Sequence, residues 1–350
     1  MEYGSEYHWH ANADFIAEQD TGFVQADWQL YRSGRDAIKA LARLAGRKKV
    51  LIPAMCCESM ILPFTQNGYD YVLYRMNENL GADEADILSK LEKGCVLLYM
   101  RYFGIESVSR EFLQQIRERG DDILLVEDRT HDILCPRRDE DFQPDAVVAS
   151  LRKWTALPDG GMLKSRLGSG EGISDGRFAA IRRAAMEEKS FYLESGDMNL
   201  KAKYMQEMAE AALLLDEDPQ PVKMGEAEER LLRHIDFEAM LRRRQDNALY
   251  LQERLRPLAE QGKIEFMCSS PENSTLYFCL LLDERDKLHR GLIHRAIYAA
   301  VIWPLVEGAA ECCPVTERTN ARMIAMPCDH RCKREDMDFI ANSVFEILGE

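Results

Sequence analysis

Up to about residue 150, short apolar runs alternate with amphipathic stretches along the chain. The apolar runs predict buried strands at residues 48–53, 71–74, 95–100, 123–127 and 146–149. The stretches between the runs predict helices at residues 37–44, 56–67, 85–93 and 110–119. Strands that alternate with short helices are typical of an α/β domain with a mostly parallel sheet.

The pattern changes at about residue 177. Long segments rich in Ala, Glu, Arg, Met and Leu predict amphipathic helices at residues 177–188, 200–215 and 226–255. A second α/β unit follows, with strands expected at 264–267, 276–282 and 323–327 and helices at 289–300 and 336–348. We therefore expect three parts: an N-terminal arm over residues 1–25, a large domain with a helical extension over 26–258, and a small C-terminal α/β domain over 259–350.

A lysine in a loop directly after a buried strand is the first candidate for chemistry. The strand expected at 146–149 is followed by Ser150 and Lys153, and the loop closes with Gly160 and Gly161. An amine placed at the buried end of a strand can hold a carbonyl compound as a Schiff base.

An acid ends the preceding expected strand. Asp128 follows Glu127 there, and the two side chains should point in opposite directions because side chains alternate along a strand. A strand-end acid followed by a strand-end lysine is what a pyridoxal phosphate site needs, since the lysine holds the aldehyde and the acid keeps the pyridine nitrogen protonated. His131 could bond the ring hydroxyl or the acid, although a lone histidine is more often structural.

Two further segments are candidates for binding a phosphate. Ser33-Gly-Arg35 precedes a predicted helix, and free amides at a helix N-terminus attract anions, although small residues there are usually plain caps. Ser150 could donate a hydrogen bond to the same phosphate, and Arg152 is either a further phosphate ligand or an exposed arginine.

Composition limits the kinds of partner. The 350 residues are 46% hydrophobic and 30% charged with a net charge of −15, which argues against nucleic acid as the main partner. The polar N-terminus lacks the apolar stretch of a signal peptide, and no run reaches membrane-spanning length, so we expect a cytoplasmic protein with reduced cysteines. The ten cysteines include no common zinc spacing, and no metal site is predicted.

Taken together and in this order, five segments resemble the DegT–StrS family of aminotransferases, which have the aspartate aminotransferase fold (fold type I of the pyridoxal phosphate enzymes). They are Ser33-Gly-Arg35, Ile52-Pro-Ala54, Tyr102-Phe-Gly104, Glu127-Asp-Arg-Thr-His131, and Ser150-Leu-Arg-Lys153 with Gly160-Gly161. Two later segments, Ile302-Trp-Pro304 and Met326-Pro-Cys-Asp-His-Arg331, resemble the small domain of the family.

The resemblance implies a role for each matching residue. Lys153 would form the Schiff base with pyridoxal 5'-phosphate, Asp128 would pair with the pyridinium, and His131 would support the ring oxygen. The residues implied in phosphate binding are Ser150, Gly34, Arg35 and, from a neighbouring subunit of a homodimer, Asn199.

The sequence also departs from the family pattern. Arg35 replaces the usual small hydroxyl residue, Arg101 stands where a histidine is common, and residues 55–58 offer no aromatic side chain to stack on the cofactor ring. The step from Ser150 to Lys153 is shorter than is common in the family. The cofactor side therefore resembles the family more than the substrate side does.

The function implied is transfer of an amino group from an amino acid such as glutamate to a keto acceptor, with a nucleotide-linked keto sugar as the typical one. Elimination, dehydration or racemisation would use the same lysine and acid, although dehydrating relatives tend to replace the lysine with histidine. A non-catalytic cofactor-binding protein on the same fold is a further alternative. A plain dinucleotide-binding domain is set aside, because no Gly-x-Gly-x-x-Gly turn follows an early strand.

Overall fold

The computed structural model describes residues 2–135, 142–267 and 276–349. Its centre is an eight-stranded sheet with the order β1-β8-β7-β6-β4-β2-β3, in which β5 pairs with β4. The strands β2, β3, β4, β6 and β7 form the parallel part, and β1, β8 and β5 pair antiparallel. The expectation of an α/β fold with a mostly parallel sheet is confirmed.

The strands of this sheet are short, and those at its centre are fully buried. Their bounds are β1 (Gln29–Tyr31), β2 (Lys49–Pro53), β3 (Asp70–Tyr74), β4 (Val96–Tyr102), β5 (Ile105–Glu106), β6 (Leu124–Asp128), β7 (Ala146–Ser150) and β8 (Gly161–Ser165). Every residue of β6 and β7 is buried, which explains why these two strands read as continuous apolar runs.

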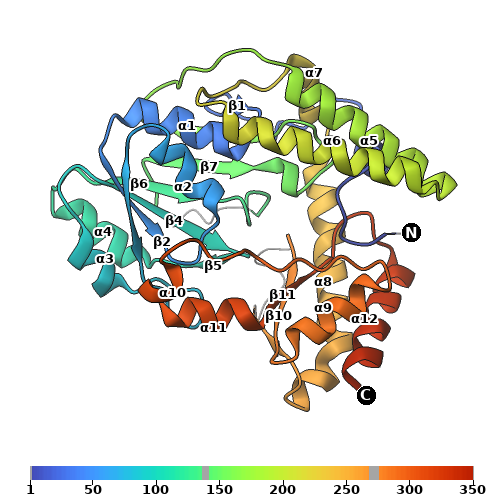
Figure 1. Ribbon diagram of the computed structural model, residues 1–350. Coiled ribbons are helices and arrows are strands. Elements are labelled where there is room, and N and C mark those ends of the chain that lie inside the picture. Colours follow the sequence, from blue (N-terminus) through green and yellow to red (C-terminus); the bar gives the residue numbers. More distant parts are fainter. Residues whose placement is uncertain (1, 136–141, 268–275, 350) are drawn as a thin grey trace.

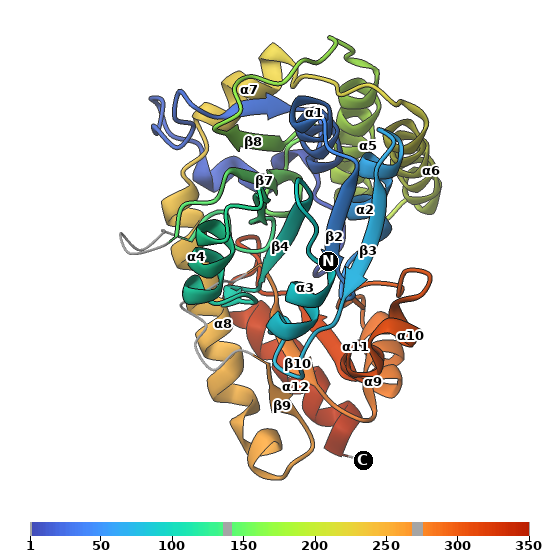
Figure 2. The same ribbon diagram turned by 90° about the vertical axis from the view of Figure 1, so that its left-hand side faces the viewer.

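Helices connect and cover the strands. The first group is α1 (Gly34–Ala45), α2 (Glu58–Thr65), α3 (Glu84–Lys90) and α4 (Arg110–Glu118). Next come α5 (Arg177–Ser195) and α6 (Met198–Glu217), which lie side by side far from the C-terminus in both views (Figures 1 and 2). Ser33 caps the start of α1, because its hydroxyl accepts from the Asp36 amide. Gly46, in the left-handed conformation, caps its end.

A second, antiparallel sheet has the order β11-β10-β9 and lies in the C-terminal part. Its strands are β9 (Glu265–Phe266), β10 (Phe278–Leu281) and β11 (Met323–Met326), and the helices of this part are α8 (Phe237–Glu260), α9 (Arg285–Ile293), α10 (Ala309–Cys312), α11 (Pro314–Arg322) and α12 (Arg334–Gly349). Side chains of α8 belong to two apolar cores, with Met240 in that of the large sheet region and Leu255 in that of the small sheet. The domain boundaries at residues 25 and 258 stay predictions.

Three of the expected helices are wrong in extent. The helix expected at 177–188 continues to Ser195. The helix expected at 226–255 is two helices, α7 (Glu226–Arg233) and α8, because Asp236 caps α8 by accepting from the Ala239 amide at 2.8 Å. The helix expected at 289–300 ends at Ile293, after which Ala296 has a positive φ of 56°. The chain then turns into extended pairing with Tyr3, whose carbonyl accepts from the Tyr298 amide.

The strands β1, β5 and β8 and the helices α10 and α11 are missing from the sequence prediction. The edge strand β1 pairs with β8, and Gly161 of β8 lies opposite Tyr31. A Cβ atom on Gly161 would lie 2.0 Å from the carbonyl oxygen of Ser33, so only glycine permits this approach. The contact sets the start of α1 against the end of β7.

The N-terminal arm packs on its own chain. It contains a 3-10 segment, Trp9–Phe15, and its buried residues include Ala11, Asn12 and Phe15. The arm therefore packs on the body of its own chain.

In the part of the chain that the structure describes, every helix is too short or too polar to cross a bilayer.

Candidate functional site

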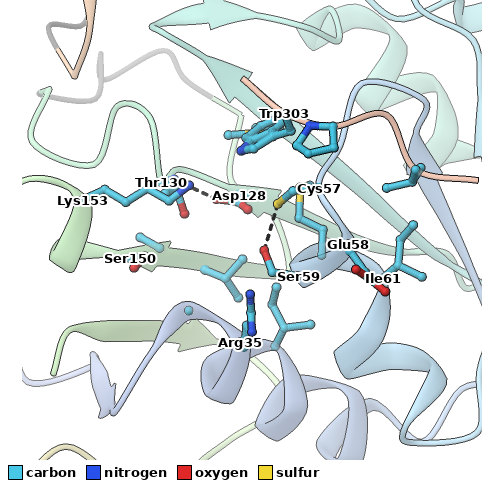
Figure 3. A pocket seen from close by; sticks show the side chains of 18 of the residues that line it. Arg35, Cys57, Glu58, Ser59, Ile61, Asp128, Thr130, Ser150, Lys153 and Trp303 are labelled. Carbon is cyan, nitrogen blue, oxygen red and sulfur yellow. Dashed lines mark hydrogen bonds between the residues drawn. The ribbon is translucent and has the colours of Figure 1, made fainter. Parts of the chain in front are cut away.

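A cavity of about 620 Å³ lies at the carboxyl ends of β6 and β7. Its walls come from the starts of α1 and α2, from the turn after β7, and from residues 303–307, which reach over from the C-terminal part (Figure 3). Ligands of open α/β sheets typically bind at the carboxyl ends of parallel strands. The position of the cavity therefore makes it the candidate active site.

Lys153 lines this cavity from a single 3-10 turn, Leu151–Lys153, that directly follows β7. The Leu151 amide donates to the Gly160 carbonyl at 2.6 Å, so the loop closes back on itself beside the lysine. The Lys153 ammonium lies 5.6 Å from the centre of the Trp303 ring. In Figure 3, Lys153, Asp128 and Thr130 lie on one side of the cavity, and Trp303 lies above them.

Asp128 lines the same cavity from the end of β6, and its neighbour Glu127 does not, as alternation along the strand predicts. The Asp128 carboxylate is buried and accepts from the Thr130 amide at 2.7 Å. Burial raises the pKa of Asp128, while the hydrogen bonds from Thr130 and the positive charge of Lys153 act in the opposite direction. A cation beside this carboxylate would relieve the cost of its burial.

His131 is buried beside the cavity in a group of aromatic rings. Its ring stacks on Phe103 at 4.5 Å and lies 5.4 Å from the Trp303 ring. Burial lowers the pKa of His131 well below 6.5, and the charge of Lys153 adds to this effect. His131 is therefore a neutral ring at physiological pH.

The predicted phosphate-binding residues meet at one end of the cavity. Gly34, Arg35 and Ser150 all line it, and a Cβ atom on Gly34 would lie 3.2 Å from that of Ser150. The Arg35 guanidinium forms an ion pair with Asp216. The α1 N-terminus and the Ser150 hydroxyl together form a cradle for an anion.

Arg152 is a half-buried cation in the same turn as Lys153. It lines the cavity with its guanidinium 5.0 Å from the Phe178 ring, and its Nε atom is buried without a hydrogen-bond partner among the described residues. Burial lowers the pKa of Arg152 to about 9, and the nearby Arg182 acts in the same direction. The Glu6 and Asp159 carboxylates act in the opposite direction. The side chain is half-buried, so it is not an exposed arginine, and its role as a phosphate ligand stays a prediction.

Two predicted site residues do not line the cavity: His131 lies beside it, and Asn199 lies away from it. Asn199 is exposed in the first turn of α6, where its amide bonds to the Asp197 carboxylate. Its predicted role toward a neighbouring subunit stays a prediction.

Several cavity residues were not predicted from the sequence as site residues. Trp303 places an aromatic ring in the cavity wall, and residues 55–58 contain none. In the sequence, only the family resemblance of residues 302–304 pointed to this segment. Cys57 and Ser59, whose side chains lie 2.8 Å apart, form part of the wall at the start of α2. Cys56, by contrast, is buried in the core.

The cavity fits the cofactor that the resemblance implies. A lysine, a buried strand-end acid and a helix N-terminus with Ser150 beside it occur together in one cavity. These are the groups needed for an aldehyde, a pyridine nitrogen and a phosphate respectively. Among the residues that the structure describes, no cluster of three His, Cys, Asp or Glu side chains could hold a metal ion.

Comparison with known protein families supports the same assignment. Residues 231–345 match the DegT/DnrJ/EryC1/StrS aminotransferase family, which confirms the resemblance noted in the sequence. A search of curated proteins gives no match.

Solved structures of aminotransferases have the same fold. A candidate sugar aminotransferase of Streptococcus pneumoniae, Spr1654 in its PMP form, superposes with a TM-score of 0.69 at 13% identity, covering 97% of this chain and 94% of that one. The aminotransferase TlmJ of Streptoalloteichus hindustanus has a TM-score of 0.67 at 15% identity, covering 96% and 93%. Helicobacter pylori PseC, an aminotransferase involved in the biosynthesis of pseudoaminic acid, has a TM-score of 0.61 at 13% identity over the full length of both chains. The fold is therefore that of the fold type I aminotransferases.

A second buried acid lies in the loop that follows Lys153. Asp159 is 2% exposed and accepts from the Gly225 amide at 3.0 Å through one oxygen, while its other oxygen has no partner among the described residues. Burial raises the pKa of Asp159 to about 7; the Glu228 carboxylate adds to this shift, and Arg152 opposes it.

We predict that Asp159→Asn removes a pH-dependent loss of stability. A carboxyl group whose pKa is raised by folding stabilises the folded state while it is protonated, and this contribution is lost as the pH rises through about 7. The variant should therefore unfold a few degrees above the wild type at about pH 8, and the difference should vanish near pH 4. Thermal unfolding across this range measures it, and a variant that is less stable at every pH would contradict the prediction.

Proposed function

We propose that this protein is a pyridoxal phosphate-dependent aminotransferase that moves an amino group from an amino acid donor such as glutamate to a keto acceptor. One observation carries the proposal: Lys153, Asp128, Arg152 and the anion cradle at the start of α1 meet in one cavity of an aminotransferase fold. When bound, the cofactor supplies an electron sink that stabilises a carbanion on the carbon next to the donor nitrogen.

Each residue of the cavity has a role in this proposal. Lys153 Nζ would hold the cofactor aldehyde, and the same nitrogen, once free, would move a proton at the substrate carbon. Asp128 holds the proton on the pyridine nitrogen, and the Thr130 amide helps to keep this carboxylate ionised. Trp303 covers this side of the cavity and limits the access of water.

We further propose a keto sugar, nucleotide-linked as is typical of the family, as the acceptor. The support is the family match together with the solved structures of a candidate sugar aminotransferase and of PseC. At the start of α2 the cavity wall carries Cys57, Glu58 and Ser59, which offer polar atoms to a hydroxyl-rich substrate.

A homodimer is the third part of the proposal, and the surface of α6 supports it. Met198, Met205 and Leu213 lie on α6 at helical spacing and are 64%, 55% and 60% exposed. An apolar stripe of this kind on a helix is typical of an interface, and a second copy of the chain would cover it in an isologous contact. Asn199 follows Met198 directly, so the same contact would place it at the interface.

We predict that the purified protein supplied with pyridoxal phosphate has a visible absorbance band that bleaches when glutamate is added. The Lys153→Ala variant should lack the band because the nitrogen that holds the aldehyde is gone. Lys164→Ala is the matched control, since that exposed lysine pairs with Asp27 away from the cavity, and it should behave as the wild type. A wild-type protein without the band would refute the proposed cofactor, and a band that glutamate leaves unchanged would refute transamination from this donor.

Arg152 provides a test of the phosphate site. Arg152→Gln should weaken the binding of pyridoxal phosphate by about tenfold, because a charge-assisted hydrogen bond to phosphate is lost. Binding of pyridoxal, which lacks the phosphate, should stay unchanged. Titration by absorbance measures both constants, and an equal loss for the two compounds would mean that Arg152 does not bind the phosphate.

The dimer is tested by placing a charge on the apolar stripe. Met205→Glu should convert the dimer into a monomer in sedimentation, because a carboxylate would be buried without a partner at the interface. Leu249→Glu is the control, since Leu249 is 43% exposed on α8 and lies outside the stripe. A wild-type protein that sediments as a monomer, or a Met205→Glu variant that still dimerises, would contradict the prediction.

A further inference from the structure

The four residues that begin with Lys153, called here the lysine segment (residues 153–156), are held by side chains from distant parts of the chain. Tyr7 of the N-terminal arm donates its hydroxyl proton to the Trp154 carbonyl at 3.0 Å, and the Lys153 carbonyl lies 3.5 Å from the same hydroxyl. Burial raises the pKa of Tyr7 to about 12, so the hydroxyl keeps its proton at physiological pH. The backbone at the lysine is therefore tied to the arm.

Asn12 of the arm holds the other end of the lysine segment. Its Nδ2 donates to the Ala156 carbonyl at 3.1 Å, and its Oδ1 accepts from the Ala156 amide at 3.2 Å and from the Thr155 hydroxyl at 2.8 Å. Asn12 is 4% exposed, and its side chain replaces a strand or helix partner for this stretch of backbone. Three hydrogen bonds from one side chain leave the segment little freedom.

Arg244 of α8 completes the arrangement from the other side. It is fully buried, and its Nη2 donates to the Trp154 carbonyl at 2.7 Å and to the Tyr7 oxygen at 2.6 Å. The arm is itself fixed to the C-terminal part, because Arg331 donates to the Ser5 carbonyl at 2.9 Å. Both supports of the segment are thus rigidly placed.

The same segment is linked to the acid of the site. The buried Trp154 indole donates to the Thr130 carbonyl at 2.7 Å, and the Thr130 amide donates to the Asp128 carboxylate. A shift of the segment would therefore move both the lysine and the loop that holds the acid.

We propose that Tyr7, Asn12 and Arg244 are positioning residues that fix the direction of Lys153 in the cavity, which makes the N-terminal arm a working part of the active site. This inference rests on the proposed function, since it concerns the attachment of the cofactor to Lys153. A displacement of the reacting nitrogen by about 1 Å lowers the rate of its reaction strongly, although the intrinsic reactivity of the amine is unchanged.

The test measures how fast pyridoxal phosphate becomes attached to Lys153. Samples are taken at intervals after mixing, sodium borohydride fixes the cofactor to the lysine that holds it, and mass spectrometry of the peptides locates and counts the label. The double variant Tyr7→Phe/Asn12→Ala should label Lys153 about tenfold more slowly than the wild type. The pH at which its visible cofactor band changes should also shift, because a reoriented lysine meets a different electrostatic environment.

Tyr3→Phe is the matched control. Tyr3 belongs to the same arm, and its hydroxyl donates to Asp336 at 3.1 Å, away from the lysine segment. The Tyr3→Phe variant should be labelled at Lys153 at the wild-type rate. Its thermal unfolding curve should have the same shape as that of the wild type. If the double variant fails to fold, the single Tyr7→Phe variant decides, with an expected slowing of about threefold.

The outcomes separate the two proposals. Labelling of Lys153 at the wild-type rate in the Tyr7→Phe and the double variant would overturn the positioning role and leave the proposed function standing. A wild-type protein that takes no label at Lys153 would overturn the proposed function, and the positioning role with it.

Discussion

The close packing of three backbone segments is the constraint on which the candidate site depends. Gly161 of β8 lies against the Ser33 carbonyl, and Gly34 lies against Ser150. A side chain at either glycine would push the start of α1 away from the end of β7. Because Gly161 meets the Ser33 backbone and Gly34 meets the Ser150 Cβ atom, the start of α1 and the turn that carries Lys153 lie close together. The anion cradle and the reactive amine thus arise from the same contact.

The second feature of the site is the presence of charges of both signs: the cavity is lined by Arg35, Arg152 and Lys153 and by Glu58, Asp128 and Glu307. The chain has a net charge of −15, and the cavity holds Lys153 and Arg152, the latter with a buried nitrogen that lacks a partner among the described residues. The Glu6 and Asp159 carboxylates offset part of the cost of burying the Arg152 guanidinium. Asp128 presents the complementary case, since a buried carboxylate with a raised pKa is suited to pair with a cation. The cavity is arranged for a ligand with separated charges of both signs.

The sequence predicted most of the central sheet because its strands are buried on both faces and form continuous apolar runs. The expected strands at 123–127 and 146–149 correspond closely to β6 and β7. It missed β1 and β8, because a three-residue strand and a glycine-led one have no distinct periodicity and depend on each other for pairing. It also merged α7 and α8, since the apolar spacing continues through the capping residue Asp236.

For the site, the sequence by itself determined the residues whose chemistry follows from their place at a strand end. Lys153, Asp128, Ser150 and Gly34 were predicted and line one cavity, because parallel strands bring their carboxyl ends to the same edge of the sheet. Only the tertiary structure decided what surrounds them. Trp303 reaches the cavity from the C-terminal part, and Tyr7 reaches the backbone beside Lys153 from the N-terminal arm. Contacts between residues so far apart in the chain depend on how whole elements pack, and local sequence patterns carry no record of that packing.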